Sequence, residues 1–423
     1  MRDKQKSNGS RFGRIVLILF FISGILRMIY SSLNVSYKAN LNKNAETIGI
    51  DNTQNISPDT GADYKIIAIS IAPDKKGVFY AISSDGKILV SHNSGKEFEI
   101  IKDTGIHCST DSSVPQCRIL TKENGNVCLF LRGFSYSIIG YGKNYGLSWN
   151  FKKVNFLVSD IFTIRNNQIL YFSVPSEYTG NLYIKGFDFN RNRFVNVTNL
   201  DSSVELVGDY NVYPVKEYDN YIYFSLSDNV GRFAKEEFTV DKNGNLHCNG
   251  NTKEELFKAY MLSQIKDFCK ISTDAFLIAT REGIYILDLN KNTLISANRV
   301  VIQSKVFINS KNLFLHPVKL IRDNRDKVIF MLTKYNGIMV GKFVGKKFYW
   351  FPLKRFYVRT FSSYDLRKFK IISPNDRVLL MGSYFWDMYE TGSVKCYDFS
   401  ISYDPFYVLI ATDRGLVRLD LKF

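Results

Sequence analysis

The sequence predicts an all-β protein built as a β-propeller and preceded by an N-terminal membrane helix. From residue 64 onward, short apolar runs are broken by Gly, Asn and Asp turns, with almost no helical periodicity. Aromatic residues make up 15% of the 423 residues, including 33 Phe and 26 Tyr, and such residues suit pleated, half-buried surfaces. A strand-rich unit also recurs along the chain, which is typical of propellers.

The recurring unit reads as strand, turn, strand, hairpin and strand. It is clearest over 65–91 and 397–421, and Leu277–Leu289 is identical to Leu409–Leu421 at eight of thirteen positions. A small sheet buries both faces only by stacking against neighbours, so repeats of about 40 to 50 residues predict blades around an axis. The units lie near 64–102, 115–154, 157–198, 203–248, 267–301, 317–353 and 366–423.

Seven blades are therefore expected, with six or eight as alternatives because the last unit holds surplus strand. The chain ends on the third strand of a unit, so we expect the outer strand of that blade to come from the N-terminal residues, where 47–50 is a candidate. One segment breaks the β pattern. Thr252 and Glu255 are spaced as a capping box ahead of apolar residues at helical spacing, which predicts an inserted helix over 252–268.

The first 30 residues have the layout of an export signal. Residues 1–14 hold five Lys or Arg and should lie in the cytoplasm, and an apolar run follows over 15–30, interrupted by Arg27. The sequence around the end of this run lacks the small residues of a cleavage site, which favours a signal anchor. A cleaved signal peptide, giving a secreted protein, is the alternative. The polar residues 31–63 are predicted to tether a propeller domain, 64–423, outside the cytoplasm.

The net charge of +16 favours anionic partners. Over 342–370, nine Lys or Arg oppose one Asp and alternate with aromatic residues, among them Trp350 as a candidate for stacking on a sugar or lipid. The alternative is a half-buried strand with its rings inward and its ammonium groups in water. The candidate anion-binding residues are Lys346, Lys347, Lys354, Arg355 and Arg359.

The six cysteines form no CxxC pair and the four histidines are scattered, so neither a metal site nor a cofactor is expected. In an exported chain, Cys108 and Cys117 are the local pair best placed for a disulfide, and buried free thiols are the alternative. Cys128, within the run VCLFL, is predicted to lie in the core.

Two turns carry a more specific pattern, Ser-His-Asn-Ser-Gly-Lys-Glu-Phe over 91–98 and Gly-Lys-Asn-Tyr-Gly-Leu-Ser-Trp over 142–149. Both resemble the Asp-box of BNR-repeat propellers, a group that includes sialidases, sortilin-type receptors and photosystem assembly factors, with Asn in place of Asp. In such a turn the Asx side chain accepts backbone N–H bonds and the glycine permits positive φ. The resemblance implies the propeller fold and a structural, non-catalytic role for Ser91, Asn93, Gly95, Phe98, Asn144, Gly146 and Trp149.

Together these features indicate a non-enzymatic, membrane-anchored binding or scaffolding propeller that recognises a protein or glycan partner outside the cytoplasm. No catalytic residue is assigned, because common catalytic motifs are absent and the sialidase signature is missing: Arg118-Ile119-Leu120 is the nearest string and lacks its proline. A sialidase-like glycoside hydrolase is one alternative, and binding of a polyanion or anionic surface through 342–370 is another. The predicted export disfavours nucleic acid.

Overall fold

A computed structural model shows the arrangement of the chain. It describes residues 49–55, 65–108, 116–164, 169–175, 182–198, 214–226, 231–248, 254–259, 265–280, 283–302, 305–308, 316–323, 328–334, 337–352, 395–413 and 415–422. Within these ranges no helix is long and apolar enough to cross a membrane. The predicted anchor, 15–30, lies outside them.

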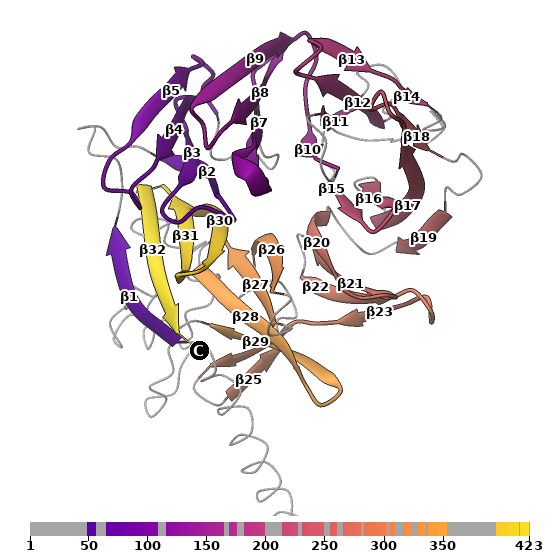
Figure 1. The fold of residues 1–423 in the computed structure, drawn as a ribbon. Coiled ribbons are helices and arrows are strands. Elements are labelled where there is room, and N and C mark those ends of the chain that lie inside the picture. The colour runs from indigo at the N-terminus through magenta and orange to yellow at the C-terminus, as the bar shows by residue number, and fades with distance from the viewer. Residues whose placement is uncertain are drawn as a thin grey trace, which may run out of the picture.

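The described strands form seven sheets arranged as blades around a central axis (Figure 1). The predicted all-β propeller is confirmed, with seven blades. Each blade places one strand next to the axis. In order from blade 1 to blade 7, these inner strands are β2 (Ile66–Ile71), β6 (Cys117–Thr121), β10 (Asp160–Phe162), β15 (Val215–Tyr218), β20 (Ile265–Ser272), β26 (Pro317–Asp323) and β30 (Cys396–Tyr403).

Blades 1, 2, 3 and 5 are four-stranded antiparallel meanders. Blade 1 continues from β2 with β3 (Phe79–Ser83), β4 (Lys87–Ser91) and β5 (Glu99–Asp103). Blade 2 continues with the 3-10 turn η1 (Glu123–Gly125), β7 (Val127–Arg132), β8 (Ser137–Lys143) and β9 (Ser148–Val154). Blade 3 adds β11 (Ile169–Pro175), β12 (Leu182–Asp188) and β13 (Arg193–Val195), and blade 5 adds β21 (Ala275–Thr280), β22 (Ile284–Asp288) and β23 (Thr293–Ser296).

Blades 4 and 6 are six-stranded sheets because neighbouring segments add strands to them. Blade 4 contains β14 (Val197–Thr198), β15, β16 (Tyr221–Leu226), β17 (Gly231–Val240), β18 (Leu246–Cys248) and β19 (Glu254–Ala259). Blade 6 contains β24 (Arg299–Ile302), β25 (Lys305–Ile308), β26, β27 (Val328–Thr333), β28 (Gly337–Val344) and β29 (Lys347–Pro352), with β24 parallel to β29.

The helix predicted over 252–268 is wrong for the described residues, which form β19 and the start of β20. Strand β17 is ten residues long, and β18 pairs only with its last three residues, Phe238–Val240. Strand β19 pairs with the other half, from Gly231 to Lys235. Pairing satisfies backbone groups that an open edge would leave exposed, so tertiary context overrides the local helical signal.

Blade 7 closes the ring with strands from both ends of the described chain. It consists of β30, β31 (Phe406–Thr412), β32 (Gly415–Lys422) and β1 (Gly49–Asn55). Strand β1 is antiparallel to β32, from Gly49 opposite Lys422 to Asn55 opposite Val417. The expected closure by N-terminal residues is therefore confirmed, and it uses residues that the sequence assigned to the tether.

Seven apolar clusters hold the blades together, one at each seam between neighbours. Successive side chains of a strand point to opposite faces, so one strand serves two seams. In β7, Val127 and Leu129 pack toward blade 1, whereas Cys128 and Phe130 pack toward blade 3. Both faces of an inner or middle strand are buried, which explains why these strands read as continuous apolar runs rather than as alternating ones.

Candidate functional site

Charged residues of alternating sign occupy the inner strands of six successive blades. From blade 2 to blade 7 they are Arg118, Asp160, Lys216, Asp267, Lys319 and Asp398. Asp267, Lys319 and Asp398, in blades 5, 6 and 7, each come directly after a register shift in the pairing of the inner strand with the second strand. The matching position of blade 1 is Ala68. Charges of strictly alternating sign cannot complete a ring with an odd number of blades. The neutral Ala68 occupies the one position where two like charges would otherwise be neighbours.

Each of the three carboxylates joins the blade before it to the blade after it. Asp267 accepts from Lys216 Nζ of blade 4 at 2.6 Å through Oδ1, and from the backbone N–H of Leu320 in blade 6 at 2.8 Å through Oδ2. Asp398 likewise accepts from Lys319 Nζ at 2.7 Å and from the N–H of Ile69 at 2.9 Å.

Asp160 repeats the arrangement between blades 2 and 4. Its Oδ1 accepts from Arg118, and its Oδ2 accepts from the N–H of Val215 at 3.0 Å. The side chains of Asp160 and Asp267 are only 5% and 8% exposed. Buried carboxylates of this kind need both a cation and hydrogen bonds, and here both are supplied by neighbouring blades.

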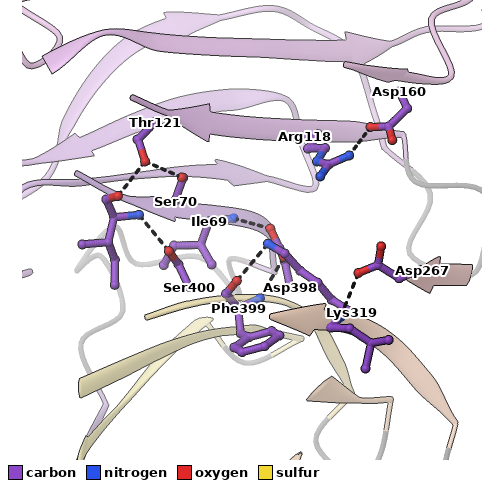
Figure 2. A network of polar contacts seen from close by, with 12 residues as sticks. Ile69, Ser70, Arg118, Thr121, Asp160, Asp267, Lys319, Asp398, Phe399 and Ser400 are labelled. Atoms are coloured by element: carbon purple, nitrogen blue, oxygen red, sulfur yellow. Dashed lines mark hydrogen bonds and ion pairs between the residues drawn. The ribbon is translucent and has the colours of Figure 1, made fainter. Parts of the chain in front are cut away.

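Neutral hydroxyl groups complete the belt across blade 1 (Figure 2). Ser400 Oγ accepts from the N–H of Ile71 at 3.0 Å, which links blade 7 to blade 1. Thr121 Oγ1 donates to the carbonyl of Ile71 at 2.6 Å and lies 2.9 Å from Ser70 Oγ, which links blade 1 to blade 2. Polar contacts therefore run through all seven blades around the axis. We call this set of contacts the axial belt.

A cavity of about 360 Å³ opens beside the axial belt, within the inner strands of blades 2, 4, 5 and 6. Five of its nine lining residues are cationic and none is a carboxylate. The lining consists of Arg118, Lys216, Tyr218, Cys269, Lys270, Lys319, Leu320, Ile321 and Arg322.

The cations of this axial cavity retain hydrogen-bonding capacity. Lys216 Nζ bonds Asp267 and the carbonyl of Phe268, and Lys319 Nζ bonds Asp398 and the carbonyl of Phe399. Since an ammonium group has three N–H donors, each lysine keeps one donor beyond these two contacts.

Arg322 differs from the other lining cations in its partner. Its guanidinium donates to the carbonyl of Lys270 at 3.0 Å, whereas Lys270 itself is paired with Asp219. Among the described contacts Arg322 has no carboxylate partner, whereas each of the other four lining cations has one.

The lining groups are poorly suited to acid–base or nucleophilic chemistry near neutral pH. Burial raises the pKa of Cys269 to about 12, and burial also raises the pKa of Tyr218 well above its usual range. Burial alone would lower the pKa of Arg118, but the carboxylate of Asp160, helped by Asp267 and Asp398, raises it. The cavity therefore presents protonated groups and fixed positive charge.

The first predicted turn connects β4 to β5 at the rim of blade 1. Ser91 Oγ accepts from the N–H of Gly95 at 2.8 Å, and Asn93 Oδ1 accepts from the N–H of Glu97 at 2.9 Å. Gly95 has φ +90°, where an L side chain is strained. Phe98 then packs edge-on against Phe79 with 5.7 Å between ring centroids.

The second predicted turn connects β8 to β9 and has a different geometry. Asn144 and Tyr145 both have positive φ, and the N–H of Gly146 donates to the carbonyl of Lys143 at 3.1 Å, as in a tight hairpin turn. No side-chain hydrogen bond of Asn144 is described. Trp149 donates from Nε1 to the carbonyl of Gly146 at 2.9 Å and packs edge-on against Tyr80 of blade 1.

The predicted basic patch is described only in part. Lys346 and Lys347 are exposed at the turn between β28 and β29, whereas Lys354, Arg355 and Arg359 lie outside the described residues. The suggestion that Trp350 stacks on a ligand is wrong, because its side chain is fully buried and donates to the carbonyl of Ala297 at 2.8 Å.

All six cysteines are buried free thiols, so the disulfide suggested between Cys108 and Cys117 is not present. The core position predicted for Cys128 is confirmed. Among the side chains that the structure describes, no group of three or more His, Cys, Asp or Glu could hold a metal ion.

The axial belt and its cavity were not predicted from the sequence, although the sequence carries a weak signal for them. Each carboxylate opens a short Asp-apolar pair at the axis, Asp160-Ile161, Asp267-Phe268 and Asp398-Phe399. In the blade before each of them, between 42 and 79 residues earlier, an Arg or Lys follows an apolar residue at the start of the inner strand. This pairing of units is visible only once the inner strands are known.

Comparisons with known proteins concern the fold. The sequence matches no protein-family model and no curated protein. Among solved structures, YCF48 from Cyanidioschyzon merolae is similar with a TM-score of 0.48 and 8% identity, over 87% of this chain and 98% of that chain. The extracellular domain of the hybrid two-component system BT4673 from B. thetaiotaomicron is similar with a TM-score of 0.46 and 11% identity. That match covers 87% of this chain and 39% of the other. The seven sheets themselves define the class, a seven-bladed β-propeller.

Proposed function

We propose that this protein is a non-enzymatic binding or scaffolding propeller, anchored in a membrane and facing the extracytoplasmic side, where it recognises a protein or glycan partner. The observation that carries the proposal is the lining of the axial cavity. Five cations face it, and its Cys269 and Tyr218 are held protonated by burial. Such a surface suits recognition of an anionic group better than chemistry on it.

The arrangement of the axial carboxylates argues against a glycoside hydrolase. That reaction generally uses two carboxyl groups flanking the scissile bond, one of them as a proton donor. Asp160, Asp267 and Asp398 each accept from a cation of the preceding blade and a backbone N–H of the next. Their oxygens are therefore committed to holding neighbouring blades together.

The proposal includes an Asp-box role for the first turn. The bonds from the N–H groups of Gly95 and Glu97 to Ser91 and Asn93, with Phe98 packed behind, support a BNR-type turn in which Asn replaces Asp. The second turn, with Asn144 and Tyr145 at positive φ, is then a variant of it.

Membrane anchoring through 15–30 is also part of the proposal, and it rests on the basic start and the apolar run. Strand β1 begins at Gly49, so 18 residues, 31–48, separate the proposed anchor from the propeller. Fully extended, they would span at most about 60 Å. A partner that binds the propeller would therefore be held near the membrane surface.

The test is isolation of the full chain from its native membranes in a mild, uncharged detergent, followed by mass measurement of the complex. We expect a stoichiometric protein or glycan to accompany the chain. A monomer recovered without a partner under several salt conditions would contradict the proposal. Turnover of a glycan panel would favour the hydrolase instead if Asp160→Asn abolishes it without changing the thermal unfolding profile and the surface control Arg193→Gln retains it.

A further inference from the structure

We propose that the axial cavity receives a carboxylate side chain from an acidic polypeptide segment of the partner. This inference rests on the proposed binding function and assigns it a site and a ligand chemistry. The cavity of about 360 Å³ lies at the lower end of the range for small-molecule sites, so it holds one or two residues rather than a folded element.

The charge balance of the site favours an anion. The carboxylates of the axial belt already accept bonds from Lys216, Lys319 and backbone N–H groups, and none of them is among the residues that line the cavity. Arg322 contributes a charge whose described partner is only the Lys270 carbonyl. An incoming carboxylate would give the Arg322 guanidinium a charged partner.

The remaining donors converge from three blades. Within the described contacts, Lys216 of blade 4 and Lys319 of blade 6 each keep one N–H, and Arg118 of blade 2 uses one nitrogen on Asp160. Their side chains are only 16% to 24% exposed. Charge-assisted hydrogen bonds in such a partly desolvated site are stronger than those on an open surface.

A polypeptide fits this lining better than an acidic sugar does. Tyr218 is the one aromatic residue among the nine that line the cavity, and its ring is engaged edge-on with Tyr223 and Phe276. The lining therefore has at most one ring that could stack on a sugar, and that ring already packs against two others. Leu320 and Ile321 instead provide apolar wall beside the cations, which suits the methylene groups of a Glu side chain.

The test measures binding of a hexaglutamate peptide carrying an uncharged dye to the full chain in uncharged detergent, by fluorescence anisotropy. We expect saturable binding that weakens with added salt, and no binding of hexaglutamine. Arg322→Gln should weaken binding roughly tenfold, because it removes one charge-assisted contact. Arg322→Lys should retain most of the affinity, and Arg193→Gln, on the exposed outer strand β13, should retain all of it.

Equal affinity of the parent and Arg322→Gln proteins, with matching thermal unfolding profiles, would overturn the proposal. If Arg322→Gln fails to fold, Lys216→Gln and Lys319→Gln are compared in the same assay, and unchanged binding in both overturns it equally. Binding of a dye-labelled oligogalacturonate that Arg322→Gln weakens, with no binding of hexaglutamate, would assign the site to an acidic glycan and overturn the polypeptide as its ligand. If Arg322→Gln still co-purifies with the native partner at full stoichiometry, the binding function stands and this site is wrong.

Discussion

At the scale of single residues, a buried hydroxyl explains the sequence repeat that first indicated blades. Thr280, Thr333 and Thr412 end the second strands of blades 5, 6 and 7 and are fully buried. Each donates to the carbonyl of a glycine at the start of the next strand or immediately before it, at 2.8 to 3.0 Å. The repeated Ile-Ala-Thr and Gly residues in blades 5 and 7 are therefore explained by a shared turn geometry.

Replacing this hydroxyl should destabilise the protein. Thr412→Val keeps the shape of the side chain but removes the hydroxyl that donates to the carbonyl of Gly415. We expect the free energy of unfolding to fall by about 1–2 kcal/mol. Urea denaturation followed by circular dichroism measures the change. Thr412→Ser, which retains the hydroxyl, should lie closer to the parent, and the reverse order of the two variants would refute this role.

Buried thiols predict a loss of stability at alkaline pH. Burial raises the pKa of Cys128 to about 11, with a partial offset from Lys122, and that of Cys269 to about 12, whereas the usual thiol value is 9.0. Above pH 9 the unfolded chain loses protons that the folded chain keeps. The free energy of unfolding therefore keeps its full value below pH 9. It falls as the pH rises toward 11, by about 1.4 kcal/mol per pH unit for each such thiol.

The contribution of one thiol can be isolated from the slope of stability against pH. Cys128→Ala removes one titrating thiol, so the free energy of unfolding should fall less steeply with pH between pH 9 and 11. Val127→Ala, at a neighbouring buried position, should lower stability at every pH and leave the slope unchanged. Thermal unfolding midpoints between pH 7 and 11 supply the measurement, and identical slopes for the parent and Cys128→Ala would contradict the assignment.

At the scale of elements, the two related turns should respond differently to the same substitution. Asn93 uses its side-chain oxygen to accept from the N–H of Glu97, whereas Asn144 has φ +51° and no described side-chain bond. Asn93→Gly should therefore cost about 1 kcal/mol, and Asn144→Gly should change stability by less than about 0.5 kcal/mol. Urea midpoints of the two variants test this, and equal losses would show that the two turns are equivalent.

Elements also show what the sequence could and could not predict. The blades were predictable, because strands buried on both faces leave long apolar runs such as VCLFL over 127–131 and LIAT over 277–280. Strand β19 was not, since its pairing with β17 outweighs a local helical pattern. The axial belt was not predictable either. Arg118 and Asp160 are 42 residues apart and Lys319 and Asp398 are 79 apart, and each alone resembles an ordinary surface charge.

At the scale of the whole molecule, the charged residues of the axial belt also link the blades at which the ring closes. Three cations and three carboxylates alternate over six blades, and Ala68 occupies the seventh position without a charge. Asp398 stands at the closing seam, because it bonds Lys319 of blade 6 and the N–H of Ile69 in blade 1. The same blade pairs β1 with β32, so both ends of the described chain meet in the blade next to the one where the alternation breaks.

This placement predicts a strong coupling between Lys319 and Asp398. Asp398→Asn keeps an oxygen for the N–H of Ile69 but leaves the ammonium of Lys319, 24% exposed, without its counter-charge. We expect a loss of about 3 kcal/mol in the free energy of unfolding, because an uncompensated charge is costly in a partly buried site. Adding Lys319→Met removes that charge, so the double variant should be more stable than Asp398→Asn alone. A double-mutant cycle by urea denaturation measures the coupling. Additive losses would show that the two residues act independently and that the alternation of charge does not stabilise the ring.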